Sequence, residues 1–275
     1  MFLQSMKKGL LLLSAFLMLV SCSEYQQVLK SKDTGEKYTF AEDLYNQAIV
    51  ENSKPKFRKA LRVLEQIVPE YRGKPQGEKL TFLYADSYYQ LEDNQTAAYQ
   101  FERFVASYPN SDKVEEATFK SARSYYLLSP RYDLDQADTF KAIDELQKYI
   151  DKYPGGEFVD QANEYGQELQ VKLEKKAYEI AKQYHHTENY KSAIVAFNNF
   201  ILEYPGSPFR EAAFYYRLDS AYLLAINSYE NLQKERLDTA RGFYNSYNKY
   251  YPEGSVYYNQ SQTQFQDIDS RLQNF

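Results

Sequence analysis

A single pattern of small and large apolar residues recurs along the chain. An alanine is followed by large residues at offsets of four, seven and eleven positions, and the pattern starts at Ala60, Ala97, Ala142, Ala193 and Ala240. These offsets place all four residues on one face of an α-helix. The last residue is a tyrosine each time, and in the final four instances a proline follows it at once. Because proline lacks an amide donor and restricts the residue before it, each of those helices carries its own stop.

A second helical segment precedes each of these helices, so the helices come in pairs. A small residue stands twelve positions before the pattern in three instances, at Ala48, Ala85 and Ala181. In the other two instances Ala122 and Leu218 take this position if about eight and ten residues are inserted before the pattern. A small residue lets two antiparallel helices approach closely, which favours a helix pair.

We therefore predict an all-α protein, a superhelical solenoid of about five helix pairs with a C-terminal capping helix. The five repeats are expected at about residues 38–74, 75–111, 112–156, 157–207 and 208–254. Residues 256–273 are expected to form the capping helix, which covers the apolar face that a stacked array exposes at its end. A heptad coiled coil is the competing interpretation, and the regular Tyr-Pro stops disfavour it.

The first 22 residues differ from everything that follows. Lys7 and Lys8 precede an apolar run from Gly9 to Val20, which ends at Ser21 and Cys22. Such a run spans roughly 18 Å as a helix, short of the ~30 Å hydrocarbon core, so residues 1–21 are predicted to be a cleaved export signal. The stretch Leu19-Val20-Ser21-Cys22 resembles the bacterial lipobox. A lone buried cysteine in an ordinary signal is the alternative.

The lipobox resemblance implies that Cys22 is the first mature residue and carries a thioether-linked diacylglyceryl group and an amide-linked acyl chain. Several chains anchor a protein stably to a membrane. Ser23 stands where the inner-membrane retention signal has Asp, so we expect the periplasmic face of the outer membrane. Residues 22–37 are expected to be a lipidated tether, and residues 38–275 the repeat domain.

The composition excludes several classes of function. The 275 residues include one Cys, no Trp and two adjacent His, and the formal net charge is -5. Nucleic acid is not expected as a partner because no basic stripe is present. His185 and His186 cannot point at one metal ion from a helix, and no phosphate loop or Ser-His-Asp set is found. We expect no catalytic site, metal site or cofactor, and a polar turn at residues 185–189.

A candidate binding surface lies on the first helix of each pair. The positions three residues before the small residue and four after it are mostly aromatic, and they share a face because they are seven apart. In the N-terminal half this surface comprises Tyr45, Phe82, Tyr89, Phe119, Arg123 and Tyr126. Such a strip suits an extended peptide, with Arg123 and, less directly, Lys79 for a terminal carboxylate. The competing interpretation is that these rings pack between consecutive repeats.

The spacing of small residues, Tyr, Ala, Phe and Pro resembles the tetratricopeptide repeat. Two features depart from it, because successive patterns are 37 to 51 residues apart and the consensus Trp is absent. With the lipobox and the turns Tyr108-Pro109-Asn110-Ser111 and Tyr204-Pro205-Gly206-Ser207, the chain resembles the BamD family of outer-membrane assembly lipoproteins. A different periplasmic repeat lipoprotein, acting as an envelope scaffold or in glycan capture, is the alternative.

The BamD resemblance implies a non-enzymatic component of the machinery that assembles outer-membrane β-barrels. Its partners would be a BamA-type assembly protein, unfolded outer-membrane protein peptides, and the membrane through the lipid anchor. A docking surface for the assembly protein is expected in about residues 189–275, where a long insertion between Ala225 and Leu237 enlarges the surface.

Overall fold

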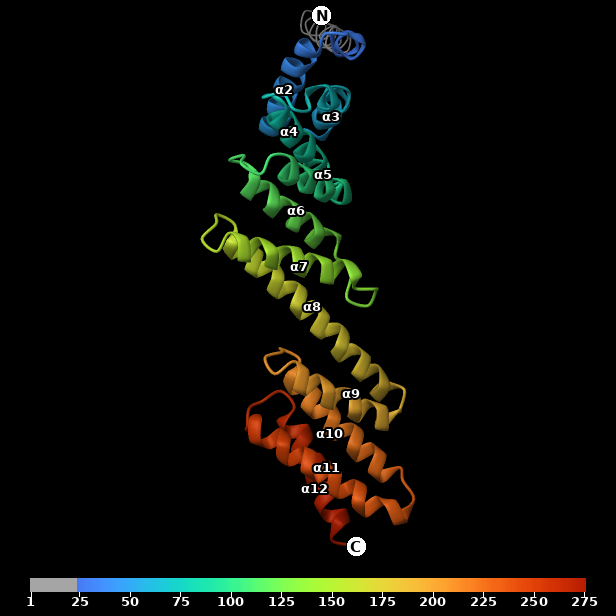
Figure 1. Cartoon of the computed structure of the whole chain (residues 1–275). Coiled ribbons are helices and arrows are strands. Elements are labelled where there is room, and N and C mark those ends of the chain that lie inside the picture. The colour runs from blue at the N-terminus through green and yellow to red at the C-terminus, as the bar shows by residue number, and fades with distance from the viewer. Residues whose placement is uncertain (1–23) are drawn as a thin grey trace, which may run out of the picture. The chain divides into compact units, whose positions relative to one another are not determined.

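The computed structural model describes residues 24–275, and they fold into α-helices joined by short turns (Figure 1). These residues contain no β-strand. The predicted export signal over residues 1–21 and the predicted lipid attachment site Cys22 lie outside the described residues. None of the helices in the described part combines the length and the apolar character that a membrane crossing requires.

The helices pair in chain order, as the sequence predicts. The first three pairs are α2 (Thr34–Glu51) with α3 (Lys54–Ile67), α4 (Gly77–Gln90) with α5 (Asn94–Ser107), and α6 (Val114–Leu128) with α7 (Ala137–Lys152). The last two are α8 (Val159–His186) with α9 (Tyr190–Glu203), and α10 (Arg210–Ile226) with α11 (Glu230–Tyr250). Helix α12 (Tyr258–Leu272) follows them. The predicted fold class, tetratricopeptide-like helix pairs with a final helix, is confirmed.

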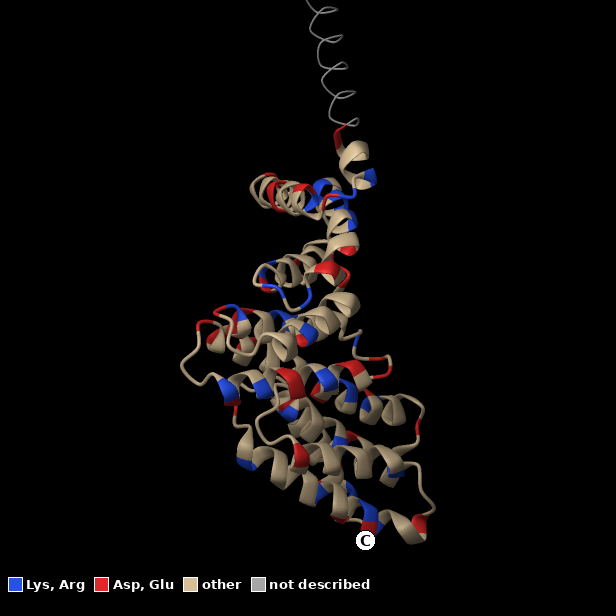
Figure 2. Ribbon diagram, turned by 45° about the horizontal axis from the view of Figure 1, so that its top comes forward, with Lys and Arg blue, Asp and Glu red and all other residues tan. Residues whose placement is uncertain are grey.

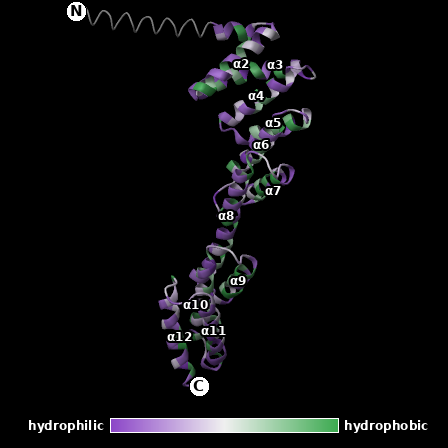
Figure 3. Cartoon of the chain, turned by 90° about the vertical axis from the view of Figure 1, so that its left-hand side faces the viewer, coloured by the Kyte–Doolittle hydropathy of each residue, from purple (hydrophilic) through white to green (hydrophobic). Residues whose placement is uncertain are grey.

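The described residues divide into two compact units. The N-terminal unit contains the described residues up to Ser129 together with Asp138–Asn163, and the C-terminal unit contains Pro130–Ala137 and Glu164–Phe275. Both units have amphipathic helices in which apolar and polar residues alternate along the ribbon (Figure 3). Acidic and basic residues are interspersed along them (Figure 2), so neither unit carries a stripe of one charge.

The recurring alanines lie in the cores of these units. All five alanines that begin the pattern are fully buried. In the N-terminal unit Ala60 packs with Ala48 and Leu64, and in the C-terminal unit Ala193 packs with Ala181 and Phe197. A methyl side chain at these positions allows the paired helices to approach closely, which is why the pattern can be read from the sequence.

The Tyr-Pro stops end four helices as predicted. Helices α5, α7, α9 and α11 each end two residues before the proline of the motif. The first instance differs, because α3 ends at Ile67 and a 3-10 helix, η1 (Val68–Tyr71), follows it. Pro69 accounts for this difference, since it cannot donate the next α-helical hydrogen bond. Tyr71 therefore lies beyond the α-helix that the pattern predicts for it.

The structure gives the conformation of two segments that the sequence singles out, the expected tether and the insertion between Ala225 and Leu237. The segment expected to be a tether is partly helical and packed: residues 24–30 are helical, and Tyr25 and Val28 are buried against α2 and α3. The insertion between Ala225 and Leu237 lies mostly in helices, because α10 continues to Ile226 and α11 begins at Glu230. The surface that this insertion adds is therefore helical.

In two of the repeats a glutamate of the first helix accepts hydrogen bonds from a tyrosine of the second helix and from an amide of the turn that follows it. We name this contact the glutamate clasp. In repeat 3, Glu115 Oε1 accepts hydrogen bonds from the Tyr149 hydroxyl at 3.0 Å and from the Glu157 amide at 2.8 Å. In repeat 5, Glu211 Oε1 accepts from the Tyr247 hydroxyl at 2.9 Å and from the Tyr257 amide at 3.2 Å. The two glutamates stand at the same position of their repeats, seven residues before Ala122 and Leu218 respectively.

Repeat 4 has the glutamate of the clasp without its donors. Glu174 is buried, and its Oε2 has no hydrogen-bond partner among residues 24–275. The residue equivalent to Tyr149 is Phe200, which has no hydroxyl. In repeat 3 the amide donor Glu157 stands four positions after the motif tyrosine, and that position in repeat 4 is Pro208, which has no amide hydrogen. Repeat 4 therefore lacks the hydroxyl donor of repeats 3 and 5 and the amide donor of repeat 3.

Candidate functional site

A groove of about 760 Å³ lies on the N-terminal unit and is lined by the first helices of its three repeats. Tyr45 and Ile49 come from α2, Phe82 and Asp86 from α4, and Lys120 from α6. The sequence places the candidate binding surface on these same helices. The groove therefore combines apolar walls with charged groups, as a site for a peptide requires.

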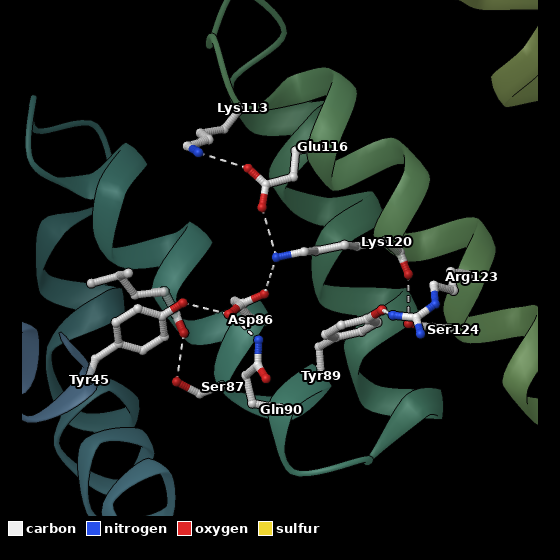
Figure 4. Close-up of polar contacts among 11 residues, drawn as sticks. Tyr45, Asp86, Ser87, Tyr89, Gln90, Lys113, Glu116, Lys120, Arg123 and Ser124 are labelled. Carbon is white, nitrogen blue, oxygen red and sulfur yellow. Dashed lines mark hydrogen bonds and ion pairs between the residues drawn. The ribbon is translucent and has the colours of Figure 1, made fainter. Parts of the chain in front are cut away.

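Asp86 is the centre of a polar network in the groove (Figure 4). Its side chain is only 1% exposed, and Lys120 Nζ approaches its Oδ1 to 2.5 Å. The Tyr45 hydroxyl and Gln90 Nε2 both donate to its Oδ2, the latter at 3.1 Å. Lys120 also pairs with Glu116 at 2.8 Å, which in turn accepts from Lys113 at 2.7 Å. The network thus joins all three first helices through partnered charges.

Burial and pairing shift the pKa values of these groups in ways that keep the network charged. Burial alone would lower the pKa of Lys120, but Asp86 and Glu116 raise it. Burial alone would raise the pKa of Glu116, but hydrogen bonds from Lys113 and Lys120 lower it. Burial and the adjacent Asp86 raise the pKa of the Tyr45 phenol. At neutral pH Lys120 is cationic, the Glu116 carboxylate is anionic and the Tyr45 phenol is a hydrogen-bond donor.

Aromatic rings surround the lysine of the network. Lys120 Nζ lies 5.4 Å from the centre of the Phe82 ring and 5.5 Å from that of Tyr89. Phe82 packs edge-on against Phe101 and Phe104, with ring centres 5.9 and 5.4 Å apart. The ring faces therefore stabilise the cation by cation–π contact and hold the apolar wall of the groove in place.

The structure brings two of the six predicted peptide-binding residues, Tyr45 and Phe82, into the groove. Tyr89 and Arg123 contact each other instead: Arg123 donates to the Tyr89 hydroxyl, and its guanidinium lies 5.5 Å from the Tyr89 ring. Neither lines the groove. Lys79 does line it, and it pairs with Glu42.

Phe119 follows the packing interpretation of the aromatic strip. It is only 4% exposed and stacks on Phe158 with ring centres 4.5 Å apart and an interplanar angle of 8°. It also contacts Tyr149 at 5.4 Å. Tyr126, two turns further along α6, is half-buried and outside the groove. The strip therefore divides into groove residues and core residues, which helical periodicity alone does not separate.

Sequence reasoning missed the charged side of the groove. Lys113, Glu116 and Lys120 lie at offsets of three and seven along α6 and its N-cap, so they share a helix face. Asp86 directly follows the small residue Ala85 on α4. Charged residues at helical spacing usually face solvent, which is why these were not distinguished. Their common face, roughly 100° around α6 from Phe119 and Tyr126, is the signal that the sequence contains.

The C-terminal unit has a histidine–aspartate pair at a comparable place. His185 Nε2 lies 3.2 Å from Asp219 Oδ2, and its Nδ1 lies 3.0 Å from Ser220 Oγ. Gln264 from α12 donates to Asp219. Burial lowers the pKa of His185 and raises that of Asp219. The sequence places His185 in a polar turn, whereas α8 continues through His186 and the turn begins after it.

Comparisons with known proteins place the chain in a family. A family model described as an outer membrane lipoprotein, YfiO, matches residues 38–234, which include every residue that lines the groove. A comparison with curated proteins finds no match. The matched range covers more than half of the 275 residues and extends over both compact units. The chain therefore belongs to the YfiO family of outer-membrane lipoproteins, which is the BamD family.

Proposed function

We propose that this lipoprotein is a non-enzymatic component of the machinery that assembles β-barrels in the outer membrane, and that its groove holds extended segments of unfolded outer-membrane proteins. The groove of the N-terminal unit is the observation that carries the proposal. Membership of an outer-membrane lipoprotein family agrees with this role. Lipids on Cys22 would anchor the protein at the periplasmic face of the membrane.

The groove offers different contacts to an aromatic side chain of the peptide and to its terminal carboxylate. Tyr45, Ile49 and Phe82 supply apolar surface for an aromatic side chain of the peptide. Lys113 and Lys79, with side chains about half exposed, are the cations that a terminal carboxylate reaches most easily. Both already pair with glutamates, so a carboxylate must displace Glu116 or Glu42. Arg123, the cation expected from the sequence, lies outside the groove.

A pair of neighbouring residues on α2 allows a test of the peptide site. Ile49 lines the groove and is 47% exposed, whereas Val50 is 85% exposed and does not line it. Binding of a labelled peptide, copied from the C-terminal segment of an outer-membrane barrel protein, is measured on the full mature chain. Ile49→Ser is expected to weaken binding by ~5-fold, for about 1 kcal/mol of lost apolar contact, and Val50→Ser to leave it unchanged. Equal affinities of both variants and wild type would exclude this groove.

The proposed partner is a BamA-type assembly protein that docks on the C-terminal unit. Extraction of the native lipoprotein in mild detergent is expected to recover such a barrel-forming protein with it. Recovery with peptidoglycan enzymes or glycan importers alone would contradict the proposal and favour an envelope scaffold or glycan capture.

A further inference from the structure

A further cavity, of about 190 Å³, lies in the N-terminal unit between the end of η1, α4 and α5. It shares no lining residue with the groove. Arg72 and Arg103 contribute two cations to its wall, and Gln100, Ser107 and Tyr108 contribute polar side chains. Among the described residues no Asp or Glu lines it. We name this cavity the η1 pocket, and its wall is positively charged.

The polar groups of the η1 pocket have no partners in the described part of the chain. Gln100 is only 8% exposed, yet its side-chain amide makes no hydrogen bond with residues 24–275. The hydroxyls of Ser107 and Tyr108 make none with these residues either. A buried amide is normally hydrogen-bonded within the protein, because the loss of its hydration is costly. The amide of Gln100 ends in the cavity instead, where it is available to a ligand.

The cations of the η1 pocket differ from those of the groove. Each lysine that lines the groove pairs with a carboxylate of the same unit. Arg72 and Arg103 have no acidic partner among residues 24–275, and Arg103 contacts only the Tyr99 ring, whose centre lies 5.7 Å from its guanidinium. Arg72 directly follows the motif tyrosine Tyr71, where the other four repeats have proline. This cation is therefore specific to the junction of the first two repeats.

We propose that the η1 pocket binds the phosphate group of a phosphate monoester through Arg72 and Arg103. Two cations without a carboxylate favour an ion with more than one negative charge, and a phosphate monoester carries about -1.5 to -2 at pH 7. Guanidinium groups bind phosphate through parallel hydrogen bonds, and the amide of Gln100 supplies a further donor. The cavity is smaller than a typical ligand site of roughly 300–1,000 Å³, so it holds the phosphate and few other atoms. The phosphate can belong to a lipid headgroup or to a soluble ester.

Calorimetry of the full mature chain with glycerol phosphate tests the pocket. Arg72→Gln and Arg103→Gln are each expected to weaken binding by at least ~10-fold, because each removes a charge-assisted contact. Gln100→Leu is expected to weaken binding by ~5-fold and to leave the Tm of the free protein unchanged or raised, since no hydrogen bond within the described protein is lost. Arg58→Gln is the control, because Arg58 is exposed on α3 and does not line the pocket.

Three results would overturn this assignment. The first is equal binding of glycerol phosphate by wild type, the control and the pocket variants, or no binding by wild type. The second is competition by acetate as strong as that by inorganic phosphate, which would show a carboxylate site. The third is a fall in the Tm of Gln100→Leu with undiminished binding, which would give Gln100 a structural role. None of these results bears on the proposed function, because the groove and the pocket share no lining residue.

Vesicle flotation then identifies the source of the phosphate. The mature chain with Cys22→Ala, which lacks the predicted lipid attachment site, is mixed with phosphatidylcholine vesicles that do or do not contain phosphatidic acid, a lipid phosphate monoester. Flotation that requires phosphatidic acid and is lost in Arg103→Gln would assign the η1 pocket to a lipid headgroup. Binding of glycerol phosphate without such flotation would assign it to a soluble phosphate ester.

Discussion

Asp86 in the N-terminal unit and Arg217 in the C-terminal unit are both charged side chains buried on the first helix of a repeat. Asp86 has Lys120, Tyr45 and Gln90 as partners within the unit. Among the residues that the structure describes, the partners of Arg217 are the side-chain amide of Asn198 and two aromatic rings. The comparison shows that the N-terminal network is complete in the free chain, whereas the C-terminal unit keeps a charge for which it provides no counter-charge. A buried charge on a first helix is therefore neutralised within its unit in one case, and in the other the described residues supply no carboxylate for it.

Removal of the central lysine of the N-terminal network should have the largest effect. Lys120→Met leaves Asp86 buried without a counter-charge, and we expect a loss of about 3–5 kcal/mol in the stability of this unit. Lys113→Met is the matched control, because the Lys113 side chain is more than half exposed and its pairing contributes about 1 kcal/mol or less. Hydrogen exchange of the amides in α4 and α6 measures the difference. Equal protection in both variants would mean that Asp86 does not depend on Lys120.

Repair of the incomplete clasp in repeat 4 should have a smaller and opposite effect. Phe200→Tyr places a hydroxyl where Tyr149 and Tyr247 have theirs, and it is expected to stabilise the C-terminal unit by about 1 kcal/mol through a bond to Glu174. Phe197→Tyr on the same helix is the control and should destabilise the unit, since Phe197 is fully buried and is not at a clasp position. Urea unfolding of both variants measures the two changes. Destabilisation by Phe200→Tyr would show that the repeats do not share one clasp geometry.

Acid should weaken the N-terminal network slightly. Because Lys113 and Lys120 lower the pKa of Glu116 below 4.5, the unfolded chain binds more protons than the folded chain as the pH falls through this range. The stability that Glu116 contributes is therefore present above pH 4.5 and decreases as the pH falls through its folded pKa. Glu116→Gln should make the unfolding free energy less dependent on pH in this range. An unchanged pH profile in the variant would assign the acid sensitivity to other carboxylates.

The sequence predicts the helix pairs well because their signals are local. The buried alanines and the Tyr-Pro stops each act within one helix, so spacing alone locates them. The candidate site depends on which helix faces touch, and there the aromatic strip divides: Phe82 lines the groove, whereas Phe119 stacks on Phe158 from the following turn. Lys120 could not be singled out, because its importance comes from Asp86, 34 residues earlier in the chain. Tyr25 and Val28 fall in the segment that the sequence predicts to be a tether, although their spacing of three residues fits one face of a helix.

Hydrogen exchange of the full mature lipoprotein with each ligand in turn tests the central claim, that the two units bind different partners. The account predicts that a C-terminal peptide of a barrel protein slows exchange in α2, α4 and α6, and that the periplasmic domains of the assembly protein slow exchange in α9, α10 and α11. Protection of the same helices by both ligands, or protection of the groove helices by the assembly protein alone, would contradict it.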